Sequence, residues 1–175
     1  VSTVQTSFWG SQKRQYETYY IPEMEKLAQT MGFELTSQKE IITTPAEAIE
    51  AKKRISQGEY DLLLIQVSTF ADGNLISPLA ETGVRLGLWG IPEITSTGAI
   101  PNNSFCGVNM YGSIIHQYID RNMPYKWFFG DVTDPLFRDR FQITVRALGA
   151  LRALRGAKIG LIGGIAPGFN DLYYD

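Results

Sequence analysis

The stretch Asp61-Leu62-Leu63-Leu64-Ile65-Gln66-Val67 decides the fold class. Its apolar residues follow one another without alternation, which is typical of a central strand in a parallel sheet that helices cover on both faces. Parallel neighbours need crossover connections of a dozen or more residues, usually containing a helix. We therefore expect helices before and after this strand.

Upstream of this strand the sequence predicts two helices. Thr44-Pro45-Ala46-Glu47 matches a capping box with proline at the first helical position, and Gly58 should end that helix. An earlier helix is indicated by apolar residues at helical spacing and a capping glycine, namely Met24, Leu27, Ala28, Met31 and Gly32. Pro22 predicts a kink or break before this face. Strands are expected near residues 3–8 and 33–37.

Downstream of the central strand the alternation of strands and helices continues. Ser77-Pro78 can begin a short helix, and strands are expected over 85–89 and 125–129. A further helix is indicated by Val108, Tyr111, Ile115 and Tyr118. Asp134-Pro135 opens a long helix whose apolar stripe is Phe137, Phe141, Val145, Leu148, Leu151 and Leu154. The pattern predicts an α/β fold with a doubly wound, open parallel sheet of the Rossmann-like type.

The segment from Lys158 to Phe169 suggests a second unit. Its apolar run Ile159 to Ile162 has the character of a buried parallel strand, and such a strand needs further neighbours. We expect an N-terminal α/β domain over 1–156 and the first strand of a second α/β domain over 157–175. Because the sequence does not supply those neighbours, we expect it to be the front part of a longer protein, and its start at Val1 rather than at methionine agrees with a partial sequence.

The composition excludes several classes of partner. The 175 residues carry 16 Lys and Arg against 18 Asp and Glu, without runs of like charge, so neither nucleic acid nor an anionic membrane is an expected partner. No apolar run approaches the roughly 20 residues of a membrane span, and no signal peptide is evident. The default location is the cytoplasm. A single cysteine, Cys106, excludes an internal disulfide.

Ligands of doubly wound sheets bind outside the carboxyl ends of the strands. The loops expected there contain Phe8-Trp9-Gly10 and Ser68-Thr69-Phe70-Ala71-Asp72, and Trp89 closes the fourth strand. Flat aromatic side chains beside hydroxyls and carboxylates suit a sugar, although packing at the rim is the favoured role for such aromatics. Asp134 caps a helix, which leaves Asp131 to meet a ligand or to shape a turn.

Three other features favour structural roles. His116 is the only histidine, so any serine or cysteine nucleophile would depend on it, but a structural or surface role is favoured. Cys106 forms no familiar zinc or catalytic motif with it, and a small buried thiol is expected. Gly163, Gly164 and Gly168 lack the spacing of a dinucleotide fingerprint or a P-loop, which favours tight turns over phosphate binding.

Several stretches together resemble the N-terminal part of the L-fucose and L-arabinose isomerase superfamily, closest to the L-fucose isomerase-like branch. They are Asp61 to Phe70, Ser104-Phe105-Cys106-Gly107 before a helix, Met123-Pro124 to Phe129-Gly130-Asp131, and the long helix running into Gly163-Gly164 and Pro167-Gly168-Phe169. The resemblance spans nearly the whole chain. It implies aldose–ketose interconversion with a divalent metal, usually Mn2+, that polarises the carbonyl and stabilises the developing oxyanion. The family's glutamate, aspartate and histidine ligands lie in later domains, so this chain is expected to hold no catalytic or metal-binding residue.

The resemblance also implies a place for this domain. In the family it lies against a neighbouring subunit and helps to cover that subunit's sugar site, within a trimer or hexamer. Carried over, the sugar contacts are Trp9 with Lys13 or Arg14, after the first strand, and Phe70 after the third, to which the reading above adds Asp131. Phe70 differs from the commoner tryptophan, which leaves the identity of the sugar open.

Two other functional classes fit the same fold. A non-enzymatic sugar-binding or sensor module would have a hinge to a second lobe and no metal ligands downstream. A nucleotide-binding domain using Gly163 to Gly168 would need an acidic ribose partner after Asp175. Fold alone does not choose among these classes.

Overall fold

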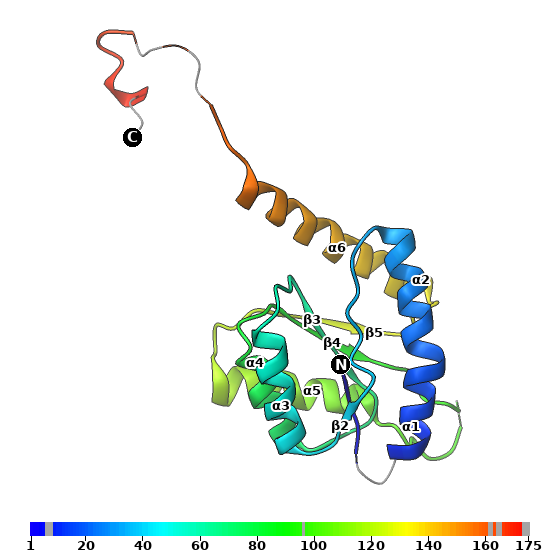
Figure 1. Cartoon of the computed structure of the whole chain (residues 1–175). Helices are drawn as coiled ribbons and strands as arrows, with labels where there is room; N and C mark the ends of the chain where they lie inside the picture. Colours follow the sequence, from blue (N-terminus) through cyan, green and yellow to red (C-terminus); the bar gives the residue numbers. More distant parts are fainter. Residues whose placement is uncertain (6–8, 96, 161–162, 164–165, 173–175) are drawn as a thin grey trace.

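Five parallel strands form one sheet in the computed structural model, which describes residues 1–5, 9–95, 97–160, 163 and 166–172 (Figure 1). Their order is β2-β1-β3-β4-β5, with every neighbouring pair parallel. The strands are β1 (Ser2–Thr3), β2 (Ile41–Ile42), β3 (Leu63–Val67), β4 (Leu86–Gly90) and β5 (Tyr125–Phe129). This arrangement confirms the predicted α/β fold, and the stretch 61–67 supplies the central strand.

One face of the sheet is covered by α3 (Pro45–Ser56), α4 (Ile76–Ala80) and α5 (Ser104–Ile114). A 3₁₀ turn, η3 (Gly73–Leu75), precedes α4, and a π-helical turn, η4 (Ile115–Ile119), follows α5. The capping box of α3 forms as predicted, because Thr44 Oγ1 accepts from Glu47 N and the Glu47 carboxylate accepts from Thr44 N. Tyr118 departs from the predicted buried stripe and is 80% exposed, because the wider π turn changes the helical spacing after Ile115.

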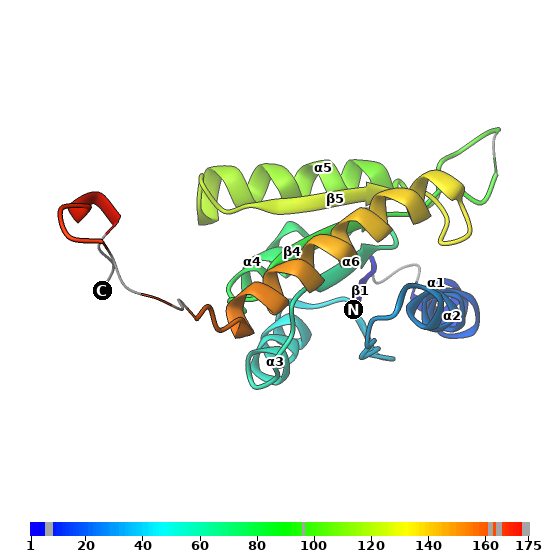
Figure 2. The ribbon, with the colours of Figure 1, turned by 90° about the horizontal axis from the view of Figure 1, so that it is seen from above.

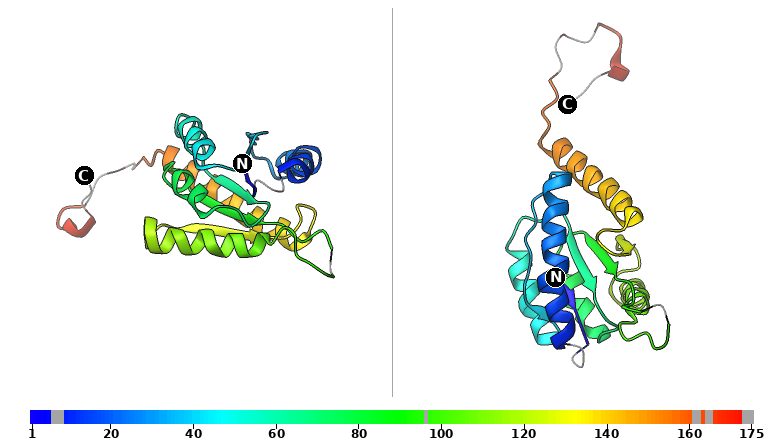
Figure 3. Two further views of the ribbon diagram at one scale, coloured as in Figure 1. Left: turned by 90° about the horizontal axis from the view of Figure 1, so that it is seen from below. Right: turned by 90° about the vertical axis from the view of Figure 1, so that its right-hand side faces the viewer.

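The other face is covered by α6 (Pro135–Gly156) and by one long rod made of α1 (Trp9–Gln15), the π-helical turn η2 (Tyr16–Tyr20) and α2 (Ile21–Met31) (Figure 3). The core between them is aromatic, with Phe137 and Phe141 stacked at 5.6 Å between ring centroids. The rod is continuous at Pro22, so the predicted break is absent, and η2 takes up the distortion just before the proline. None of the described helices is long and apolar enough to cross a membrane.

The predicted strand over residues 33–37 is wrong. Residues 33–39 have no regular structure, and the second strand is Ile41–Ile42 instead. Phe33 N donates to Ala28 O at 3.1 Å as part of the end of α2, and the Phe33 ring packs edge-on against Phe141. The segment therefore crosses the helical layer before it reaches the sheet. The predicted first strand is also shorter than expected, and its part over 6–8 lies outside the described residues.

Helix α6 crosses the strands obliquely (Figure 2), and its second half extends past the ends of the strands (Figures 1 and 3). Its stripe is buried at Phe137 and Phe141, but Leu154 is 71% exposed. Residues 157–160 have no regular structure and Ile159 is 97% exposed, so the buried strand expected here is not seen in the described part. Leu161 and Ile162 lie outside the described residues, and the domain boundary at 156 stays a prediction.

Candidate functional site

The strand order places the topological switch point between β1 and β3. From β1 the chain crosses to β2 on one side, and then returns to β3 on the other side of β1. The loops that leave β1 and β3 therefore diverge, and ligands of open α/β sheets bind in the crevice between such loops. Several segments lie at this edge of the sheet, and together we call them the carboxyl-end rim. They are α1 and the described residues that follow β1, β3 and β4, namely 4–5, 68–72, 91–95 and 97–103.

Hydrogen bonds tie the loop after β1 to the loop after β3. Gln5 N donates to Thr69 Oγ1 at 2.6 Å, and the hydroxyls of Ser2 and Ser68 lie 2.8 Å apart. Ser2, Ser68 and Thr69 are all buried. The two loops that diverge from the switch point are thus fixed to each other at their bases.

The loop after β4 closes the rim through a buried amide pair. Gln12 Nε2, from α1, donates to Asn102 Oδ1 at 2.7 Å, and Phe70 N donates to Asn102 O at 2.7 Å. The carboxylate of Glu93 accepts from the backbone N–H groups of Asn102 and Asn103, at 3.0 and 2.6 Å. One asparagine therefore joins α1, the Phe70 loop and the loop before α5.

Phe70 is the predicted sugar contact whose surroundings are best defined. It follows β3 directly, it is 38% exposed, and the bond from its N–H to Asn102 fixes its backbone. Helix α5 approaches closely here, since a Cβ added at Gly107 would lie 3.4 Å from Phe70 Cα. The aromatic ring is thus presented at the surface on a fixed backbone.

The other residues predicted after β1 lie on α1. Trp9 begins this helix, and its side chain is outside the described part. Lys13 is half-buried with its Nζ 3.8 Å from Glu17 Oε1, and Arg14 is exposed. Through Gln12, the same helix is bonded to the Asn102 that holds Phe70. The structure therefore brings α1 and Phe70 into one network.

Asp131 lies after β5 in a different set of contacts. Its Oδ1 accepts from Tyr19 Oη at 2.7 Å, from Thr133 N at 2.9 Å and from Thr133 Oγ1 at 2.7 Å. Burial, with the hydrogen bond to Asp131 next in size, raises the pKa of Tyr19. Asp131 thus shapes a turn and holds the helical rod, and these contacts do not join it to the Phe70 loop.

Trp89 does not take part in the rim. Its ring is 2% exposed and packs among Tyr20 and Phe137, and its Nε1 donates to Gly130 O at 2.9 Å. Packing is therefore the observed role of this aromatic residue. Asp72, in the loop after β3, caps η3 by accepting from Asn74 N at 2.9 Å.

Neither the single histidine nor the single cysteine has a hydrogen bond to the rim network among the described residues. His116 is exposed, with Nδ1 3.0 Å from Arg121 O and its ring edge-on to Tyr125. The prediction that Cys106 is buried is wrong, because it lies on the solvent side of α5 next to Gly107, which packs on the sheet. Gly163 and Gly168 have positive φ angles, as turn glycines do, while Gly164 lies outside the described residues.

The residues that build the rim network, Gln12, Glu93 and Asn102, were not singled out from the sequence. Gln12 and Asn102 are 90 positions apart, so only the folded sheet brings them together. The polar loop over 95–104 was the available signal, and Asn103 within it takes a left-handed backbone conformation with a φ of 46°. The amides and hydroxyls of this network are buried and bonded to one another, so they hold the loops in place, and the exposed Phe70 ring is the group that can pack against the C–H groups of a polyhydroxylated ligand.

Comparison with known proteins gives distant relatives of one kind. No family model matches the chain. It is 27% identical over 134 residues to the sulfoquinovose isomerases of Priestia megaterium (strain ATCC 12872 / QMB1551) and Priestia aryabhattai, and 28% identical over 134 residues to that of Alkalicoccus urumqiensis. These matches cover 75–76% of this chain and 29% of each relative. The relatives support a sugar isomerase at a coarse level, without pointing to L-fucose in particular.

Proposed function

We propose that this chain is part of an aldose–ketose isomerase, in which it contributes subunit contacts and a cover over the sugar. The observation that carries this proposal is the carboxyl-end rim, where the buried Gln12–Asn102 pair joins α1 to the exposed Phe70. A residue that covers a bound sugar benefits from a fixed backbone, since its backbone then loses little conformational entropy when the side chain contacts the sugar. The similarity to sulfoquinovose isomerases supports the class of reaction.

The metal would be held elsewhere in the protein. Among the described residues no group of three or more His, Cys, Asp and Glu side chains could hold a metal ion. A divalent ion such as Mn2+ therefore does not fit the described part of this chain, and we assign it to the remainder of a longer protein. We propose that the intact protein is a homo-oligomer of three or six subunits, so that the rim of one subunit can cover the sugar bound by the next.

The sugar that we propose carries a negative charge. The relatives are named for sulfoquinovose, a hexose with a sulfonate group. Lys13 and Arg14 place two basic side chains on α1, one turn from the start of the helix that borders the rim. A cation near the sulfonate would favour such a sugar over a neutral hexose.

An isomerase assay of the intact protein tests this proposal. The protein is incubated with Mn2+ and, in separate reactions, with sulfoquinovose, L-fucose and L-arabinose, and ketose formation is followed by NMR. We expect turnover of sulfoquinovose with the largest kcat/KM of the three. Saturable binding of a sugar without any ketose would instead favour a sugar-binding module, and turnover of the two neutral sugars alone would remove the role of the basic pair.

The 175-residue chain on its own provides a matched experiment. We expect it to form no ketose with added Mn2+ from any of the three sugars, because the proposed metal ligands belong to other parts of the protein. Measurable turnover by this chain alone would contradict the assignment of the metal to the remainder.

A further inference from the structure

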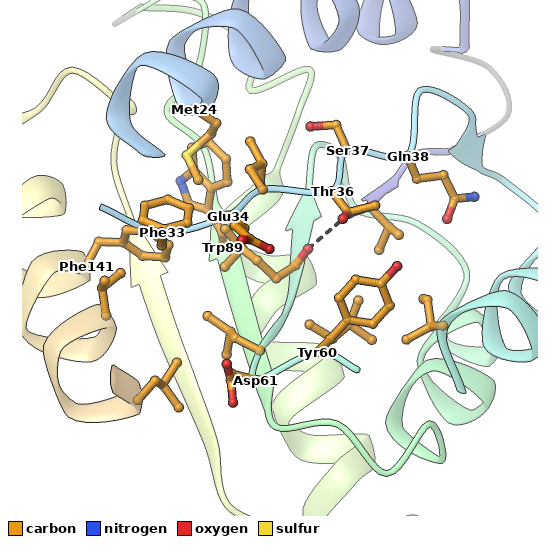
Figure 4. A pocket seen from close by; sticks show the side chains of 18 of the residues that line it. Met24, Phe33, Glu34, Thr36, Ser37, Gln38, Tyr60, Asp61, Trp89 and Phe141 are labelled. Atoms are coloured by element: carbon orange, nitrogen blue, oxygen red, sulfur yellow. Dashed lines mark hydrogen bonds between the residues drawn. The ribbon is translucent and has the colours of Figure 1, made fainter. Parts of the chain in front are cut away.

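A cavity of about 670 Å3 lies between the helical rod, the segment 32–38, α6 and the sheet (Figure 4). Its walls carry large apolar side chains, among them Met24, Phe33, Trp89 and Phe141. Both the volume and the aromatic lining are typical of sites for small organic molecules. It is further lined by residues 59–64, at the start of β3, and by the second half of α6, whereas the carboxyl-end rim follows the ends of the strands.

Gln66 places an unused hydrogen-bond donor at this cavity. It pairs in register with Trp89, which in turn pairs with Phe128, so all three side chains share the face of the sheet under α2 and α6. Gln66 is 1% exposed, and its Oε1 accepts from Ser68 Oγ at 2.8 Å. Its Nε2 has no hydrogen-bond partner among the residues that the structure describes. Buried polar atoms nearly always have partners, so this amide indicates a missing acceptor.

Two ion pairs involve charged side chains that line the cavity. Asp61 Oδ2 accepts from Arg152 Nη1 at 3.0 Å, and Arg54 Nη2 lies 3.5 Å from Glu40 Oε2. The amino group of Val1, which also lines the cavity, donates to Leu64 O at 3.1 Å. Glu34 and Glu59 also line the cavity, so its walls carry both signs of charge, which favours an uncharged occupant over an ion of one sign.

We propose that this cavity binds a small, planar, uncharged molecule whose buried end presents a hydrogen-bond acceptor, a carbonyl oxygen or a ring nitrogen, to Gln66 Nε2. The aromatic walls provide contact for the flat body of such a molecule. The buried amide discriminates in favour of molecules with an acceptor, because a ligand without one leaves the donor unpaired. This inference rests on the cavity and on Gln66 alone, and it is independent of the proposed isomerase activity.

Two probes of the same shape test the proposal on the 175-residue chain labelled with 15N. The probe 1-indanone has a carbonyl acceptor, and indane lacks it. In NMR titrations we expect 1-indanone to shift the side-chain amide signals of Gln66 and the indole signal of Trp89 in a saturable way. The affinity for indane should be about fivefold lower than that for 1-indanone, which is the loss expected for one neutral hydrogen bond.

Two variants separate the hydrogen bond from general apolar binding. Gln66→Leu should remove the preference for 1-indanone over indane, whereas Gln29→Leu, the same change at an exposed position of α2, should keep it. Equal affinity of the unchanged chain for both probes, or no saturable shift at Gln66 and Trp89, would overturn the proposal. The comparison of the two probes on the unchanged chain decides the question even if Gln66→Leu does not fold.

Discussion

Asp131 shows how one carboxylate oxygen can hold together two distant parts of the chain. Its Oδ1 accepts hydrogen bonds from Tyr19, 112 positions earlier, and from the backbone and hydroxyl of Thr133. From the sequence this residue could be predicted at the end of a strand, but its choice between ligand and turn could not. The partner on the helical rod is visible only in the folded protein.

Replacing Asp131 with alanine should lower the free energy of unfolding by about 2 kcal/mol, since hydrogen bonds to a charged group are lost and Tyr19 Oη loses its acceptor. Tyr19→Phe should cost less, about 1 kcal/mol, because it removes one of the three bonds. Urea denaturation at pH 7 measures both. Asp139→Ala, at an exposed position of α6, is the control. Unchanged stability in Asp131→Ala would mean that the carboxylate is available for a ligand.

At the scale of elements, the sequence predicted helix ends and strands correctly where the interactions that form them are local. The capping box of α3, the glycine that ends α2 and the strand over 125–129 depend on neighbouring residues, and they form as predicted. The strand expected over 33–37 fails because the contact between Phe33 and Phe141 spans 108 positions. Long-range packing of that kind overrides local strand preference.

The capping box of α3 gives a stability that depends on pH. Burial alone would raise the pKa of Glu47, but hydrogen bonds from Thr43 and Thr44 outweigh it and lower the pKa below its ordinary value of 4.5. The ionised carboxylate therefore stabilises the fold above that pH, and the stabilisation is lost as the pH falls through the lowered pKa. In urea denaturation, Glu47→Gln should be less stable than the unchanged chain at pH 7, with the difference narrowing below pH 4.5.

Thr44→Ala removes the other half of the box and should cost about 1 kcal/mol. This substitution removes the hydrogen bond from Glu47 N to Thr44 Oγ1, which does not depend on the charge of Glu47. The loss of stability in Thr44→Ala should therefore persist at pH 7 and below pH 4.5. A difference between Glu47→Gln and the unchanged chain that stays constant down to pH 3 would contradict the role given to the Glu47 carboxylate.

Substitution by alanine at two helical glycines, Gly107 and Gly149, should change the stability of the fold in opposite directions. A Cβ at Gly107 of α5 would lie 2.7 Å from Val67 Cγ1 and 3.3 Å from Thr69 O, whereas a Cβ at Gly149 of α6 would meet nothing within 4 Å. Gly149→Ala should therefore raise stability by roughly 0.5–1 kcal/mol, the ordinary helical preference for alanine. Gly107→Ala should lower it, because α5 must move away from β3. Equal gains in thermal stability for both variants would show that α5 does not approach the sheet this closely.

At the scale of the whole molecule, the sheet and its two helical layers could be predicted from alternating strand and helix patterns, while the rim network could not. Gln12, Glu93 and Asn102 carry no local motif, and their side chains meet only after β1, β3 and β4 lie side by side. Gln66 is the one polar residue within the apolar run 62–67, yet the sequence alone does not reveal that its Nε2 has no hydrogen-bond partner among the residues that the structure describes. The cavity likewise arises from the whole fold.

The proposed cover role is tested most directly by steady-state kinetics of Phe70→Ala in the intact protein, with the sugar that it turns over. We expect KM to rise several-fold while kcat changes less, because a cover residue contributes mainly binding that substrate and transition state share. The control is Phe105→Ala, an exposed aromatic residue of α5 that packs against Phe129 outside the rim, and it should leave KM unchanged. An unchanged KM in Phe70→Ala would contradict the account and leave Phe70 as surface packing.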